Sequence, residues 1–163
     1  MRLQTFCEES YEFHTLIDPI ATFCYQPLPD QPVIKIVPGK PERFLAIAPT
    51  NRAVGELFDV KFKGEDKWGN PSNKCDCQFT LRATHQVEGL PKKVKLSSGQ
   101  FAGHISGLRV NEPADFEIEF LDDSGALVCA TNPIRIENAP MSRHFWGDLH
   151  GQSEETIGTG TAE

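Results

Sequence analysis

The stretch CQFTLRAT, residues 77–84, decides the fold class of this chain. Polar residues in it alternate with Cys77, Phe79, Leu81 and Ala83. Because successive side chains of a β-strand point to opposite faces of a sheet, this period of two places every apolar side chain on one face. A helix would scatter the same residues around its axis. The stretch therefore predicts a strand with one buried and one solvated face, as a two-layer sandwich requires.

The same alternation recurs on both sides of this stretch, between residues 43 and 137. It is strict at 58–63 and 115–120, and further strand candidates are 43–48, 92–96, 101–110 and 126–137. Clusters of Gly, Asn, Asp and Pro separate these runs, as turns between short strands require. Pro133 interrupts the last run and cannot donate a ladder hydrogen bond, so we expect an edge strand or a bulge there. The pattern predicts an all-β fold, an immunoglobulin-like β-sandwich of about seven or more strands, with an extended or disordered C-terminal tail.

Three regions are expected along the chain. Residues 1–42 contain five prolines between positions 27 and 41 and a short apolar run at 33–37, so we expect an extended segment with strands that packs on the sandwich. Residues 43–138 form the sandwich. Residues 139–163 are expected to be a linker followed by the beginning of a second domain.

Composition excludes some classes of function. The net charge of -7 repels nucleic acid and anionic lipid headgroups, so neither a nucleic acid nor a membrane is expected as a partner. The N-terminus turns acidic at Glu8 before an apolar stretch develops, which is unlike a secretory signal, and a cytoplasmic location is expected. Five cysteines at these spacings do not form a recognisable disulfide framework. We expect Cys75 and Cys77 to be buried reduced thiols, with a metal half-site as the alternative.

The C-terminal stretch HFWGDLHGQS, residues 144–153, has a different character. Read as a strand, it places Asp148, His150 and Gln152 on one face near the strand's C-terminal end. In barrels of alternating strands and helices, active sites form at that end. Imidazole and carboxylate groups are suitable ligands for Zn, Mn or Fe ions that polarise a phosphoryl oxygen. We therefore expect the chain to end soon after the first strand of the barrel domain of a metal-dependent enzyme.

The same residues carry a resemblance to a known family. The octapeptide WGDLHGQS at 146–153 resembles the opening motif of the polymerase and histidinol phosphatase (PHP) superfamily, and in particular an uncharacterised branch that begins Trp-Gly-Asp-Leu-His. The resemblance implies a distorted (β/α) barrel that holds divalent metals and hydrolyses phosphoesters. It assigns His150 as a metal ligand and Asp148 as a neighbouring group, while Gln152 stands where the family has its second histidine. An amide is a weak transition-metal ligand.

These observations predict an accessory module. The chain itself is expected to contain no catalytic residue and no cofactor, and the missing barrel domain is its expected partner, with a homo-oligomer as a further possibility. The alternative is a carbohydrate- or protein-binding sandwich in which Trp68, beside a turn, stacks on a sugar. The acidic residues Asp115, Glu117 and Glu119 could bind calcium, but we expect them to form a solvated outer face.

Overall fold

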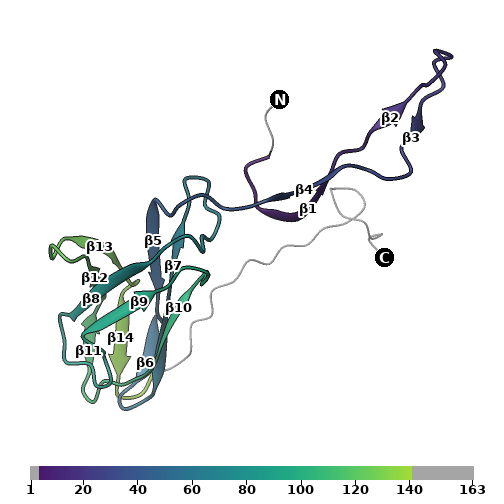
Figure 1. Ribbon diagram of the computed structural model, residues 1–163. Coiled ribbons are helices and arrows are strands. Elements are labelled where there is room, and N and C mark those ends of the chain that lie inside the picture. The colour runs from purple at the N-terminus through teal and green to yellow at the C-terminus, as the bar shows by residue number, and fades with distance from the viewer. Residues whose placement is uncertain (1–3, 141–163) are drawn as a thin grey trace, which may run out of the picture.

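The computed structural model describes residues 4–140, and every regular element in that range is a β-strand (Figure 1). The all-β fold predicted from the sequence is confirmed. Within the described residues there is no helix that could cross a membrane. The tail that was expected after residue 140 lies outside the described residues.

The first layer of the sandwich is an antiparallel sheet in the order β10-β7-β5. Its strands are β5 (Arg43–Ile47), β7 (Phe58–Glu65) and β10 (Gly103–Leu108). The alternation at 58–63 has the predicted result, because Phe58, Val60 and Phe62 are buried while Asp59 and Lys61 are exposed.

The second layer contains two groups of strands that continue into one another. One group has the order β13-β12-β8-β9, and the other has the order β11-β14-β6. Their bounds are β6 (Asn51–Ala53), β8 (Cys77–Ala83), β9 (Lys93–Leu96), β11 (Ala114–Phe116), β12 (Ile118–Leu121), β13 (Leu127–Ala130) and β14 (Ile134–Glu137). Only Glu117 separates β11 from β12, and residues 131–133 separate β13 from β14. The last strand, β14, pairs antiparallel with β11 and parallel with β6.

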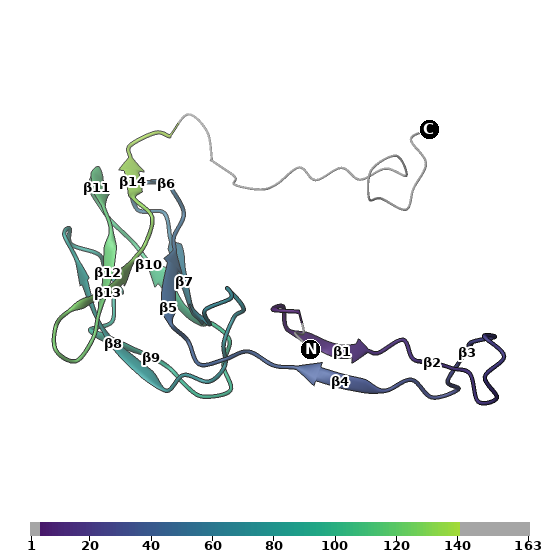
Figure 2. The same cartoon turned by 90° about the horizontal axis from the view of Figure 1, so that it is seen from above.

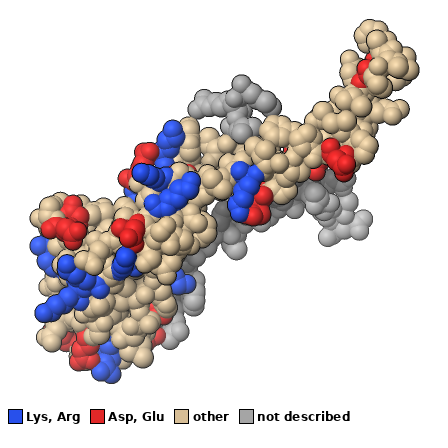
Figure 3. All heavy atoms as spheres, in the orientation of Figure 1, with Lys and Arg blue, Asp and Glu red and all other residues tan. Residues whose placement is uncertain are grey.

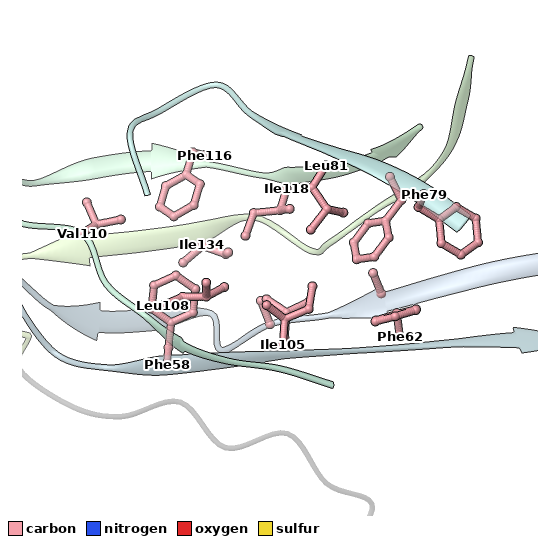
Figure 4. Close-up of a cluster of buried hydrophobic side chains, with 14 of the residues drawn as sticks. Phe58, Phe62, Phe79, Leu81, Ile105, Leu108, Val110, Phe116, Ile118 and Ile134 are labelled. Carbon is pink, nitrogen blue, oxygen red and sulfur yellow. The ribbon is translucent and has the colours of Figure 1, made fainter. Parts of the chain in front are cut away.

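Aliphatic and phenylalanine side chains fill the space between the two layers (Figure 4). The ring centroids of Phe62 and Phe120 lie 5.2 Å apart, and those of Phe62 and Phe79 lie 6.2 Å apart. Phe58 contacts Phe116 in the same way, with a centroid distance of 6.5 Å. These rings join β7 to strands of the opposite layer, so burial of the predicted apolar faces holds the sandwich together.

The predicted interruption at Asn132-Pro133 is the point where the chain passes from β13 to β14. Thr131 supplies hydrogen bonds to Ile118 at this interruption of the strand. Its hydroxyl accepts from the Ile118 N–H at 3.0 Å, and its own N–H donates to the Ile118 carbonyl at 3.0 Å. The Asn132 side chain accepts from the Ala48 N–H at 2.9 Å, which ties the end of β5 to this corner. Buried backbone groups at the break therefore keep their partners.

The N-terminal segment forms a ribbon that projects away from the sandwich (Figures 1 and 2). Its inner part pairs β1 (Glu8–Glu12) with β4 (Val33–Ile36), and its outer part pairs β2 (Leu16–Ile17) with β3 (Gln26–Pro27), all antiparallel. None of residues 4–37 is buried, and the first buried residue is Pro38. The segment expected to pack on the sandwich contacts it at the ribbon's base, near Asn70, while the rest extends outward.

Candidate functional site

A cleft of about 390 Å³ lies where the base of the ribbon meets the sandwich. The ribbon side contributes Gln4, Thr5, Ile36 and Val37. The turn after β7 contributes residues 66–68 and 70 from the sandwich side. The connection into β5 closes the cleft with Gly39, Lys40 and Glu42. Basic side chains gather at this junction of body and ribbon in Figure 3. The cleft therefore combines an apolar wall with charged groups of both signs.

The turn at residues 66–70 is organised by the carboxylate of Asp66. This carboxylate accepts hydrogen bonds from the N–H groups of Trp68 at 2.9 Å and Asn70 at 3.0 Å, and from the Gly39 N–H at 3.0 Å. Gly69 supplies the positive φ of 86° that the turn requires. Because an Asp side chain can hydrogen-bond backbone groups two residues ahead, the sequence DKWGN forms this turn locally.

Asp66 is buried, with only 4% of its surface exposed. Burial raises the pKa of its carboxyl, but the hydrogen bonds from Gly39, Asn70 and Trp68 outweigh that effect and lower the pKa to about 2. The group is therefore an ionised structural carboxylate at neutral pH. Its hydrogen bonds fix the position of the turn instead of leaving a free acid or base for catalysis.

Asn70 and Ser72 connect this turn to the N-terminal segment. The Asn70 amide donates to the Thr5 carbonyl at 2.8 Å and accepts from the Cys7 N–H at 3.0 Å. The Ser72 hydroxyl donates to the Gly39 carbonyl at 2.6 Å. We call Asp66, Asn70 and Ser72 the clasp, because together they hold both strands of the ribbon's base against the sandwich.

Trp68 is the candidate binding residue predicted from the sequence, and it lies at this cleft. Its side chain is 45% exposed and also borders a neighbouring hollow with Arg43 and Gly69. The Lys67 ammonium lies 5.0 Å from the centroid of the indole ring, a cation–π contact. Trp68 is thus an aromatic surface beside hydrogen-bonding groups, an arrangement suited to binding a polar ligand.

The predicted metal-site residues Asp148, His150 and Gln152 lie outside the described residues. Within residues 4–140, no group of three or more His, Cys, Asp or Glu side chains is placed to hold a metal ion.

The expectation that Cys75 and Cys77 are reduced thiols is wrong, because the two form a disulfide in this structure. Their Cα atoms are 5.5 Å apart, within the range that a disulfide spans, and as residues two apart in an extended chain they point to the same side. The same pairing removes both sulfurs from the alternative metal half-site.

The acidic stripe on β11 and β12 has basic partners across the sheet. Asp115 pairs with Arg135 at 2.9 Å, and Glu119 pairs with Arg82 at 2.6 Å. Asp122 accepts hydrogen bonds from the N–H groups of Ser124 and Ala126, which closes the following turn. This arrangement agrees with the expected solvated outer face, since protein cations and N–H groups already engage these carboxylates.

The clasp could not be predicted from the sequence. The Gly, Asn and Pro residues of the segment GEDKWGNP, residues 64–71, indicate a turn, but the pattern alone does not reveal that Asn70 binds a backbone more than sixty residues earlier. An Asp four residues before an Asn, in a turn with Gly between them, was the available local signal.

No protein-family model matches this chain. An uncharacterized protein of Chlamydia muridarum is 25% identical over 162 residues, which covers 98% of this chain and 26% of the relative. An uncharacterized protein of Chlamydia trachomatis matches with the same identity and coverage. A third, from Chlamydia pneumoniae, is 25% identical over 153 residues, which covers 93% of this chain and 24% of the relative. The chain spans about a quarter of the length of the curated relatives that it matches.

Proposed function

We propose that this chain is a non-catalytic accessory β-sandwich domain of a larger metal-dependent hydrolase that acts on phosphoesters. The observation that carries the proposal is coverage: the match extends over nearly the whole chain but only about a quarter of each relative. A sandwich with a projecting ribbon suits a structural or binding module, and carboxylates such as Asp66 and Asp115 are engaged in a turn and an ion pair.

The hydrolase part of the proposal rests on the C-terminal sequence. The resemblance of residues 146–153 to the opening motif of the PHP superfamily assigns His150 to a metal site, with Asp148 beside it. In that proposal a Zn, Mn or Fe ion would supply Lewis-acid activation of a phosphoester and of water, using ligands from outside this chain as well.

Phosphatase assays with added Mn²⁺ or Zn²⁺ test this proposal. We expect the 163-residue chain to give no turnover above the buffer blank, because it offers at most a part of the ligand set. The longer polypeptide encoded by the same gene should hydrolyse a phosphoester, and His150→Ala in it should lower kcat at least about tenfold. His104→Ala, on the surface of β10, is the matched control and should leave the rate unchanged. Turnover by the 163-residue chain alone would contradict the proposal.

A second candidate function is favoured by the position of Trp68. An indole 45% exposed beside a cleft lined with amide, carboxylate and ammonium groups resembles the aromatic platforms on which sugars stack. We expect any glycan that binds here to lose about fivefold in affinity with Trp68→Ala, since an aromatic contact typically contributes about 1 kcal/mol. Phe101→Ala is the control, because Phe101 is also half exposed but lies away from the cleft. A glycan array without a hit, or binding unaffected by Trp68→Ala, would dismiss this function.

A further inference from the structure

The ribbon exposes a large share of the apolar surface of the described chain. Leu16, Ile17, Ile20, Phe23 and Tyr25 all lie in its outer part, and their exposed fractions range from 41% for Ile17 to 85% for Phe23. In Figure 3 this outer part carries few charged side chains. Apolar side chains of this size gathered on one projection mark a contact surface, in contrast to single exposed residues scattered over a body.

The end of the ribbon is held in one conformation by its own hydrogen bonds. The Asp18 carboxylate accepts from the Phe23 N–H at 2.6 Å and from the Thr22 N–H at 3.1 Å. Ala21 and Phe23 adopt positive φ values of 54° and 62°, which residues other than glycine rarely adopt. Such strained conformations persist where the surroundings impose them, and they occur often at binding surfaces. We call residues 18–25 the tip.

The ribbon is too small to be stable in water by itself. An isolated pair of short strands is at best marginally stable, and it becomes stable when it packs against a further element. The clasp fixes only the base of the ribbon, through Thr5, Cys7 and Gly39. No residue from 4 to 37 is buried, so the outer part receives no cover from the sandwich. A covering surface must therefore come from outside the described chain.

The length of the relatives, the small area of the tip and the net charge favour a surface on the same polypeptide. The curated relatives are about four times as long as the part that this chain matches, so most of their polypeptide is available as a partner. The tip carries three large apolar side chains, two of them aromatic. Since an aromatic side chain buries ~150–250 Å², the area of the tip falls short of the ~800 Å² that each partner buries in a stable interface between separate molecules. A covalent tether raises the effective concentration to about the millimolar range, where such a small contact suffices.

The net charge of -7 points in the same direction, because it opposes both self-association and docking on an anionic membrane. We propose that the ribbon, with the tip as its anchor, packs into an apolar groove on the remaining part of the longer protein and fixes the orientation of the sandwich relative to it. This inference rests on the proposed function in one respect, namely that the chain is part of a longer polypeptide.

Hydrogen exchange measured on both the 163-residue chain and the longer polypeptide tests the inference. We expect the amides of residues 16–27 to exchange at least about tenfold more slowly in the longer polypeptide, because docking there suppresses local opening. Phe23→Asp in the longer polypeptide should abolish this difference, since a carboxylate in an apolar groove is strongly disfavoured. Leu57→Asp is the matched control: Leu57 is 62% exposed on the sandwich, and its substitution should leave the protection in place.

Each other outcome overturns the inference. Equal exchange of residues 16–27 in the two polypeptides would mean that the ribbon stays uncovered. Protection that increases with the concentration of the 163-residue chain, together with a dimer in sedimentation, would assign the ribbon to a second copy. Binding of the chain to phosphatidylserine vesicles through Phe23 would assign it to a membrane, and a reading frame that ends at residue 163 would remove the partner. Phosphoesterase activity assayed on the same longer sample is independent of these results, so failure of the hydrolase proposal is distinguishable from failure of the docking.

Discussion

Replacement of Asp66 with alanine is expected to lower the free energy of unfolding by about 3 kcal/mol, since buried N–H groups that lose a charged acceptor cost roughly 1–3 kcal/mol each. The substitution leaves the N–H groups of Gly39, Trp68 and Asn70 without the carboxylate to which they donate. It also removes the support of the Asn70 side chain, so the Cys7 amide should exchange faster with solvent. Urea unfolding and hydrogen exchange measure the two effects.

Asp66 also predicts a pH dependence with a definite sign. Its pKa is lowered from 3.8 to about 2 in the folded chain, so the ionised form stabilises the fold. This contribution is fully present above about pH 5 and is lost as the pH falls from about 4 towards 2. Asp66→Asn lacks the titrating group, so the stability gap between wild type and Asp66→Asn should narrow over that range. A gap that stays constant between pH 5 and pH 2.5 would contradict this account.

Asp122→Ala is the matched control for Asp66→Ala. Asp122 closes its own turn through Ser124 and Ala126 in a comparable way, but at a solvent-accessible position and without contact to the N-terminal segment. Water can replace its hydrogen bonds, so we expect a loss below about 1 kcal/mol. If both substitutions cost the same, the burial of Asp66 and its role in the clasp would not be the cause.

Gly103→Ala is expected to destabilise the sandwich by about 2–3 kcal/mol, in the range observed for overpacked cores. Gly103 faces Phe62 across the β10–β7 pair, and a Cβ atom at position 103 would lie 2.1 Å from the Cζ atom of that ring. The ring is buried and contacts Phe79 and Phe120, so it cannot move aside without displacing both. Thermal and urea unfolding measure the loss.

A double-mutant cycle separates the steric clash from a general effect of alanine in a strand. Phe62→Leu removes the ring, so Gly103→Ala added to it should cost at least about 1 kcal/mol less than in the wild type, as expected for residues in contact. Gly39→Ala, in the connection between β4 and β5, is the control for an added methyl group without a clash, because its Cβ atom would meet Asp66 at an ordinary 3.4 Å. Strict additivity of the two substitutions would exclude the proposed clash.

Most strands of the sandwich could be predicted from the sequence because they bury one face, whereas β6, in which only Asn51 is buried, left no apolar pattern. The alternation in β7 and β8 survives in the structure as alternating buried and exposed positions. The assignment of strands to layers could not be predicted in the same way. The position of β14 between β11 and β6, away from β12 and β13, depends on contacts such as those of Thr131 and Asn132. The local sequence pattern does not specify these contacts.

The ribbon and the clasp were less accessible to prediction for a different physical reason. A strand that is solvated on both faces shows no alternation, so β1, β2 and β3 left no pattern to recognise, whereas β4 was predicted from its apolar run. The clasp depends on Asn70 reaching the backbone of Thr5 and Cys7, and a contact between distant residues leaves no mark in either local sequence. Trp68 was identified from its exposed-turn context, and the structure places it beside that contact.

The parallel pairing of β6 with β14 has a mechanical consequence. Residues 51–53 lie opposite residues 135–137, with further hydrogen bonds from Arg135 N–H to Thr50 and from Val54 N–H to Glu137. A pull that enters through residue 43 and leaves through residue 138 drags these two strands along their axes in opposite directions. All the hydrogen bonds between them then bear the load together and cannot open one by one. The domain is therefore built to resist tension applied through its two ends.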